Sequence, residues 1–186
     1  MLIPALCKKS ELKAAYDRMR YSNEVMYYNG CIEDGMFHVA GENDDWSEGL
    51  FEYAICDEEE NIIGYLSYRI DYYASGVFNF GLINFTGKPS QHITGAILHT
   101  MKYLELQNMH RIEFRCVSGN PAAKLYDRIV KRLKENLLCS VRKTVLVDTF
   151  KDRTGKYHDS YIYEITRWTT LADKTLAKER IREGTL

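Results

Sequence analysis

One stretch of the chain combines residue types that suit the binding of an anionic group. Residues 91–96 read Gln-His-Ile-Thr-Gly-Ala and lie where a predicted strand gives way to a predicted helix. The first backbone N–H groups of a helix have no partners within the helix and, with the helix dipole, favour phosphate. Gly95 would allow close approach of a diphosphate, and Lys88 would add a positive charge beside it. A glycine near a helix start is also common as plain punctuation, so both interpretations stay open.

The elements that must position this stretch follow from hydrophobic periodicity and turn residues. The segment 21–48, rich in Tyr, Gly and acidic residues, is interpreted as irregular with some helix. Strands are predicted at 1–7, 50–56, 61–71, 76–85, 110–117, 139–149 and 158–166. Helices are predicted from an N-cap at Ser10, over about 90–107, from Pro121 onward, and over 169–183.

The order of these elements predicts an α/β fold. Strand 76–85, helix 90–107 and strand 110–117 form a βαβ unit, whose two strands are expected to be parallel. Antiparallel strands precede and follow this unit. We therefore expect a mixed, mostly antiparallel sheet of about seven strands with helices on both faces. Residues 1–167 are expected to form one domain, with 168–186 as its C-terminal helical extension.

Composition limits the classes of function. The chain has 186 residues and a formal net charge of −1, and it lacks the dense basic run that nucleic-acid binding requires. Nothing in it approaches a membrane span. The five cysteines lie far apart without a CxxC pair, which argues against a disulfide framework or a metal site and favours a cytoplasmic protein.

Several strings, taken with the order of elements, resemble the GNAT (Gcn5-related N-acetyltransferase) superfamily as far as Arg167. They resemble in particular the branch that includes ribosomal-protein alanine N-acetyltransferases. The strings are residues 91–96, 110–113 with 120–127, 139–142, and 155–163. The resemblance implies a GNAT fold whose parallel strands splay apart at a cofactor site.

The resemblance also implies acetyl-CoA as the cofactor and assigns residues to it. Thr94 stands where a glycine is usual in the pyrophosphate loop, and the spacing from Asn120 to Tyr126 is one residue shorter than usual. Backbone N–H groups near Ile83 to Phe85 would bind the carbonyl and the pantetheine, and Asn120 would contact the pantetheine arm. The expected cofactor-binding residues are Ile83, Phe85, Lys88, Gln91, Thr94, Gly95, Ala96 and Asn120.

Amine acetylation requires a proton donor for the leaving thiolate and a proton acceptor for the amine. The resemblance assigns the donor to Tyr126, whose phenol, with an ordinary pKa of about 10, stays protonated at neutral pH; a tyrosine packed on the sheet is the alternative. Residues 77–85 contain no carboxylate to act as the base. Glu113 is the candidate base, with His110 or bulk water as alternatives. The structural interpretation of Glu113 is an outward-facing strand charge, and that of His110 is a cap at the start of the strand.

The function expected from the resemblance is transfer of an acetyl group from acetyl-CoA to a primary amine by direct attack in a ternary complex. The acceptor would be a protein N-terminus or a small molecule, and a homodimer is possible. Four acidic residues would attract a cationic amine or form a solvated loop: Glu42, Asp44, Asp45 and Glu48. The alternative function is a catalytically degenerate module of the same fold that binds coenzyme A or another ligand as a sensor or interaction domain.

Overall fold

The structure, a computed structural model, describes residues 1–19, 48–135, 139–152, 154–167 and Glu179. One mixed sheet of seven strands runs through these residues in the spatial order β1-β2-β3-β4-β5-β7-β6. The strands are β1 (Leu2–Pro4), β2 (Leu50–Cys56), β3 (Ile62–Asp71), β4 (Gly76–Asn84), β5 (Arg111–Val117), β6 (Cys139–Lys151) and β7 (Tyr157–Arg167). The α-helices are α1 (Lys9–Met19), α3 (Gln91–Leu106) and α4 (Ala123–Glu135), and a short 3-10 helix covers Ala5–Lys8.

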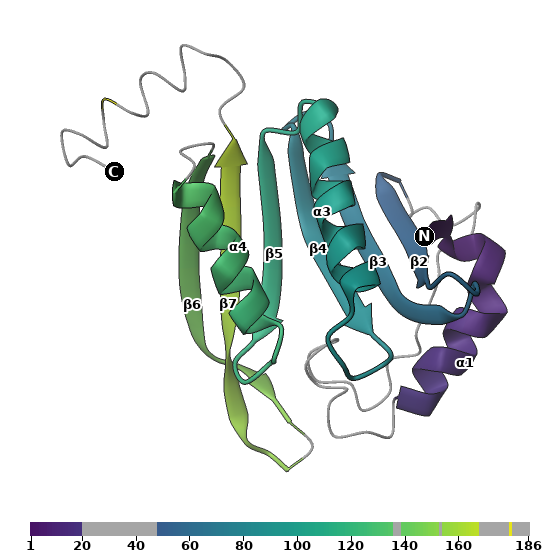
Figure 1. Ribbon diagram of the computed structural model, residues 1–186. Coiled ribbons are helices and arrows are strands. Elements are labelled where there is room, and N and C mark those ends of the chain that lie inside the picture. Colours follow the sequence, from purple (N-terminus) through teal and green to yellow (C-terminus); the bar gives the residue numbers. More distant parts are fainter. Residues whose placement is uncertain (20–47, 136–138, 153, 168–178, 180–186) are drawn as a thin grey trace.

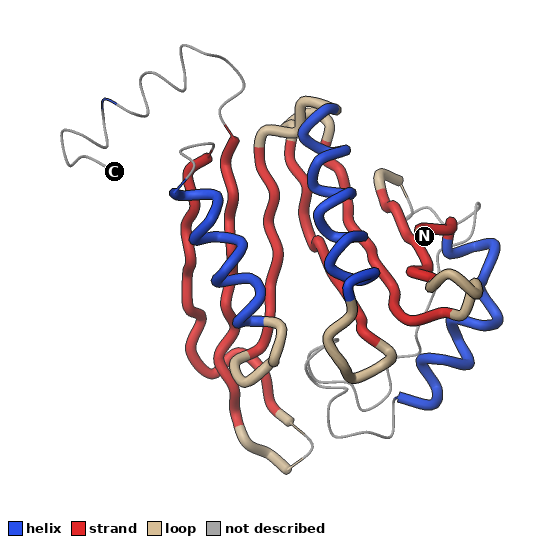
Figure 2. Tube along the Cα trace, in the orientation of Figure 1, coloured by secondary structure: helices blue, strands red, loops and turns tan. Residues whose placement is uncertain are grey.

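Helices cover both faces of the sheet. Successive strand residues point to opposite faces, so each face presents apolar side chains that a helix can cover. Ile55 and Leu66 lie in the apolar cluster that includes the buried residues of α3. Their neighbours Ala54 and Tyr65 lie in a second cluster with Leu12 and Tyr16 of α1. Figures 1 and 2 show α3 and α4 side by side on one face of the sheet. The expected α/β class, mixed sheet and two helical layers are thus confirmed.

The parallel pair β4 and β5 is joined at one end and parted at the other. Pairing covers only two register positions, Gly76 with Arg111 and Val77 with Ile112. Beyond them β4 continues to Asn84 and β5 to Val117 without pairing to each other, and the two strands diverge in Figure 1. The expected splay of the parallel strands is confirmed, and it lies at their carboxyl ends.

A bulge in β4 lies at the start of the parted segment. The register with β3 shifts between Ser67 and Arg69, so that Tyr68 faces both Asn79 and Phe80. Asn79 has φ 52°, a left-handed conformation that asparagine tolerates better than most residues. Bulges bend a strand and increase its twist, which favours the divergence of β4 from β5.

Element boundaries differ from the sequence-based expectation in a few places. The first strand ends at Pro4 and gives way to a 3-10 helix, whereas a strand over 1–7 was expected. Ser10 lies inside α1, which begins at Lys9, and is not its N-cap. The expected irregular segment 21–48 falls outside the described residues except for Glu48, which is exposed. The expected C-terminal extension 168–186 falls outside them except for Glu179.

Candidate active site

The parted ends of β4 and β5 meet the starts of two helices. The chain leaves β4 at Asn84 and enters α3 at Gln91; it leaves β5 at Val117 and enters α4 at Ala123. Because β4 and β5 are parallel, both helices begin at the same edge of the sheet (Figure 1). This edge therefore combines unpaired strand backbone with two helix N-termini, which together can accept an extended anionic ligand.

Backbone direction along β4 decides which N–H groups face the parted segment. The N–H of Phe85 donates to the carbonyl of Ile63 on β3 at 3.0 Å, and Ile83 stands opposite Tyr65 in the same register. Alternation in an antiparallel pair makes both positions bond to β3. The expected use of N–H groups at Ile83 and Phe85 is therefore corrected, because those groups point away from β5.

The backbone groups of Leu82 and Asn84 point the other way, toward β5. Their register partners on β3 are Leu66 and Gly64, and these are the positions of the ladder that exchange no hydrogen bonds. Since β5 has already diverged at this point, the two N–H groups face the parted segment. Which N–H groups of β4 face β5 cannot be read from the sequence, because this follows from the strand register.

The start of α3 is organised by Ser90. Ser90 is the N-cap, and its hydroxyl accepts from the N–H of Ile93 at 3.4 Å while its carbonyl accepts from the N–H of Thr94 at 3.1 Å. Gln91 and His92 thus carry the helix N–H groups that remain without an intrahelical partner. The capping role of Ser90 was readable from its type and its place before the helix.

The expected pyrophosphate loop at residues 91–96 is the first part of α3 itself. The N–H of Gly95 lies one turn inside the helix, where it bonds to the carbonyl four residues before it. A side chain at Gly95 would meet no atom within 4 Å, so the space beside Gly95 is open, as the close approach of a diphosphate would need. The expected role of Gly95 and Ala96 in cofactor binding stays a prediction.

A pocket of about 530 Å³ lies along one flank of the first turns of α3. Met1 and Leu2 at the β1 edge of the sheet form its opposite wall. Its lining from α3 consists of Gln91, His92, Gly95, Ala96 and His99. These residues thus lie on the β1 side of α3, whereas Asn120 and Tyr126 belong to the β5 side.

Lys88 lies in the loop between β4 and α3, which polar side chains hold in shape. Asn84 donates its Nδ2 to the carbonyl of Lys88 at 2.8 Å and accepts from the N–H of Thr86 at 2.9 Å. Gly87 has φ 64°, which permits the tight turn. The side chain of Lys88 is exposed beside the parted edge.

Asn120 organises the start of α4. Its side-chain oxygen accepts from the N–H of Ala122 at 2.8 Å, and its carbonyl accepts from the N–H of Ala123 at 3.0 Å. Asn120 is 8% exposed. The geometry gives this residue a helix-capping function at the edge where pantetheine binding was expected.

Tyr126 lies in the first turn of α4 with its ring in the core. The ring meets Phe114 edge-on at 4.9 Å between centroids and Tyr163 at 5.8 Å. Phe114 and Tyr163 stack on each other at 5.0 Å. The ring position of Tyr126 is therefore fixed by packing against β5 and β7.

Asp127, the next residue of α4, ties the helix to β6 and β7. Its Oδ1 accepts from the hydroxyl of Tyr163 and from Nζ of Lys143, both at 2.9 Å. The hydrogen bond from Lys143 lowers the pKa of Asp127, and burial raises the pKa of Tyr163. Burial also raises the pKa of the neighbouring Cys116 thiol to about 11, so this thiol is a poor nucleophile at neutral pH.

Replacing Asp127 with Asn tests this anchor through its pH dependence. A lowered pKa stabilises the fold above the ordinary carboxyl value of about 3.9, and the contribution is lost as pH falls through the folded-state pKa. Because the side chain is 51% exposed, we expect a melting temperature about 1–3 °C lower at pH 7. Thermal unfolding of both proteins from pH 7 to pH 3 should show this gap closing. A gap that stays constant with pH would contradict the ion-pair explanation.

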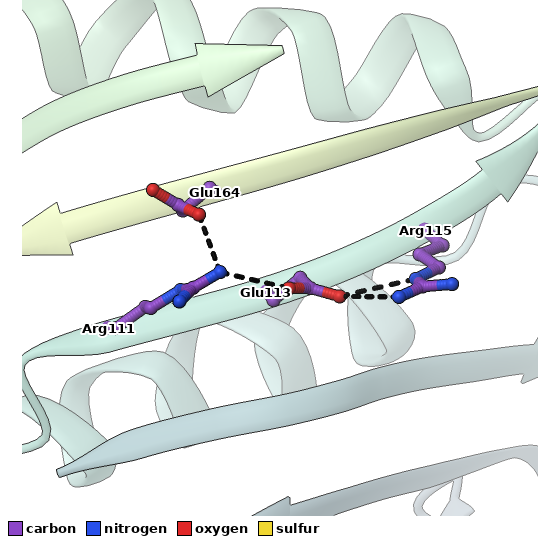
Figure 3. Close-up of polar contacts among 4 residues, drawn as sticks. All are labelled: Arg111, Glu113, Arg115 and Glu164. Carbon is purple, nitrogen blue, oxygen red and sulfur yellow. Dashed lines mark hydrogen bonds and ion pairs between the residues drawn. The ribbon is translucent and has the colours of Figure 1, made fainter. Parts of the chain in front are cut away.

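Glu113 lies on the sheet face opposite α4, in a chain of charged side chains (Figure 3). Its Oε2 accepts from Nη2 of Arg111 at 3.2 Å, and its Oε1 accepts from Nη2 and Nε of Arg115 at 3.0 and 3.2 Å. Arg111 also pairs with Glu164 of β7 at 2.6 Å. With both carboxylate oxygens engaged by guanidinium groups, Glu113 is poorly placed to accept a proton. Arg111, Glu113 and Arg115 are two residues apart on one strand, and this spacing predicts that their charged side chains lie in a row.

His110, the other candidate base, lies at the joined end of β4 and β5, just before β5 begins. Its N–H donates to the carbonyl of Ser75 at 2.7 Å, just before the paired positions of β4 and β5.

No group of three or more potential metal ligands occurs in the described part of the chain. Among the helices described, none is both long and apolar enough to cross a membrane.

Comparison of the structure with solved structures identifies the architecture. A Chromobacterium violaceum protein assigned to the GNAT family of acetyltransferases superimposes with a TM-score of 0.59 at 16% identity, covering 89% of this chain and 81% of the other. Vibrio cholerae spermidine N-acetyltransferase in complex with CoA and spermine gives 0.58 at 18% identity, covering 82% and 88%. The chain has the GNAT fold. A protein assigned as a phosphinothricin N-acetyltransferase gives 0.60 at 13% identity, covering 91% and 98%. No family model and no curated protein sequence matches the chain.

In this GNAT fold the candidate residues fall into separate groups. Lys88, Gln91 and Thr94 lie at or before the start of α3, and Asn120 and Tyr126 lie at the start of α4. Glu113 lies on the sheet face opposite α4. The residues that sequence reasoning missed are Leu82, Ser90, Asp127 and Arg115.

Proposed function

We propose that this protein is an acetyl-CoA-dependent N-acetyltransferase that acts on a primary amine. The observation that carries the proposal is the parting of β4 and β5 at the edge where α3 and α4 both begin. Unpaired strand N–H groups and uncapped helix N–H groups then lie along one edge, as an extended ligand with a carbonyl and phosphates requires. A solved structure of similar fold contains CoA.

The described residues fit coenzyme A in the chemistry of their donors. The N–H groups of Leu82 and Asn84 would donate to a carbonyl or amide oxygen between the strands, and those of Gln91 and His92 would donate to phosphate oxygens. Lys88 adds a positive charge next to them. When bound, acetyl-CoA supplies the activated acyl group, and the protein has to hold it beside the amine.

Acetyl transfer needs a donor of a proton to the leaving thiolate and an acceptor of a proton from the amine. Tyr126 remains our candidate for the proton donor, because a phenol at the start of α4 is neutral at physiological pH. Glu113 is reassigned from base to a partner of two arginines. We propose that the amine loses its proton to water, since a small fraction of free amine is present at neutral pH.

Calorimetry and a thiol-release assay test the proposal together. We expect coenzyme A to bind with a micromolar to millimolar Kd, and acetyl-CoA to release thiol only when an amine acceptor is present. The acceptor panel should include peptides with free N-termini, amino acids and spermidine. Absence of coenzyme A binding at millimolar concentration would overturn the proposal.

A second candidate function is a non-catalytic GNAT module that binds coenzyme A as a sensor or interaction domain. Two observations favour it: the ring of Tyr126 is packed among Phe114 and Tyr163, and the side chain of Asn120 serves as a helix cap. Binding of coenzyme A without turnover of any acceptor would support this candidate. Homodimer formation stays a prediction under either function.

A further inference from the structure

The charged chain on β5 and β7 has one open end. It runs from Glu164 to Arg111, then to Glu113, and finally to Arg115. Among the described residues, Arg111 lies between two carboxylates, whereas Arg115 meets only one, which it shares with Arg111. Arg115 is also the most exposed of the four, at 53% of its side chain, against 11% for Glu113. The positive charge of the network is therefore least neutralised at Arg115.

Arg115 keeps unused hydrogen-bond donors in a fixed orientation. A guanidinium group has five N–H donors, and Glu113 engages the edge formed by Nε and Nη2. The edge formed by Nη1 and the second N–H of Nη2 has no partner among the described residues. This edge has the planar geometry that binds a carboxylate through two parallel hydrogen bonds.

The position of Arg115 relates this edge to the parted strands. Arg115 lies three residues beyond Ile112, the last residue of β5 that pairs with β4. Its neighbours Phe114 and Cys116 belong to the same core cluster as Tyr126 of α4, so Arg115 points to the opposite face of the sheet. A ligand that approaches the parted segment from the face opposite α4 therefore meets this guanidinium group.

We propose that Arg115 binds an anionic group of the acceptor, so that the substrate is a small amine that also carries a carboxylate, of the α-amino-acid type. Glu113 acts as a positioning residue that holds the guanidinium with its free edge outward. A polycationic amine is disfavoured by the same charge. This inference rests on the proposed acetyltransferase function and names its class of acceptor.

The test compares acceptors that differ only in the carboxylate. Thiol release is assayed with α-amino acids, with the amide of each of these amino acids, and with spermidine. The proteins compared are the wild type, Arg115→Gln, Arg115→Lys and Arg142→Gln. Arg142 is the matched control, because it is an exposed arginine of β6 on the same sheet face. Amides have the more readily deprotonated amine, so a preference for the acids runs against intrinsic reactivity.

We expect the wild type to prefer the acids. Arg115→Gln should raise KM for the acids about 10- to 100-fold, as expected for loss of a charged hydrogen-bonded pair, and leave kcat nearly unchanged. The KM of Arg115→Lys for the acids should fall between those of the wild type and Arg115→Gln. The KM of Arg142→Gln should match that of the wild type. Calorimetric titration of an amino acid into the CoA-bound proteins should show the same order of Kd.

Turnover without preference for the acids, or equal kinetics of Arg115→Gln and Arg142→Gln, would overturn this inference and leave the proposed function standing. Faster turnover of spermidine than of any acid by the wild type would also overturn this inference and leave the proposed function standing. Failure of every amine to release thiol would overturn both.

Discussion

Replacing Tyr126 with Phe is expected to lower kcat by about 100-fold or more, within the range that a general acid contributes. The ring contacts with Phe114 and Tyr163 do not involve the hydroxyl group, so the variant should keep its packing. The Kd for coenzyme A should stay within about twofold, because only a proton donor is removed. Steady-state kinetics with acetyl-CoA and calorimetry with CoA measure the two quantities separately.

Tyr163→Phe is the matched control on the neighbouring strand. Tyr163 is fully buried and donates its hydroxyl to Asp127, so it does not reach a ligand. Its loss should leave kcat nearly unchanged and lower the free energy of unfolding by about 1.5–3 kcal/mol, as for a hydrogen bond to a charged group. Equal kcat for Tyr126→Phe and wild type would exclude Tyr126 as the acid; equal losses in both variants would point to disturbed packing instead.

The sequence predicted the elements well because their signals are strong and local. Ile93, Ile97, Met101 and Leu104 recur at helical spacing, and all four are buried in α3. The alternation in β2 and the charged turn after it gave the antiparallel hairpin that the register confirms. The βαβ unit followed from the order of these elements, and with it the parallel pair.

The details of the candidate site depend on contacts that the sequence does not show. Which N–H groups of β4 face β5 is decided by the register with β3 and by the bulge at Asn79, both of which need the partner strand. Gly95 matched a motif, yet the capping by Ser90 starts the helix before it. For Glu113, the alternation of side chains along β5 places Arg111 and Arg115 on the same face of the sheet as Glu113. Its ion pairs could therefore have been predicted from the sequence.

Replacing Leu82 with Pro is expected to reduce kcat/KM by about 100- to 1,000-fold relative to Leu82→Ala, the cost typical of losing one preorganised donor to a carbonyl oxygen. Both variants lose the leucine side chain, which packs partly buried against the core. Only proline also removes the N–H that faces β5. The ratio of the two rates therefore isolates the backbone donor.

The same strand supplies the control for structural damage. Ile83 bonds to β3 in the ladder, so Ile83→Pro should break a sheet hydrogen bond and unfold the protein at lower temperature. Leu82→Pro should instead melt close to Leu82→Ala, because the N–H at position 82 takes no part in the ladder with β3. If Leu82→Pro is folded and as active as Leu82→Ala, the thioester is not held by this strand. The parting of β4 and β5 would then need another explanation than acyl transfer.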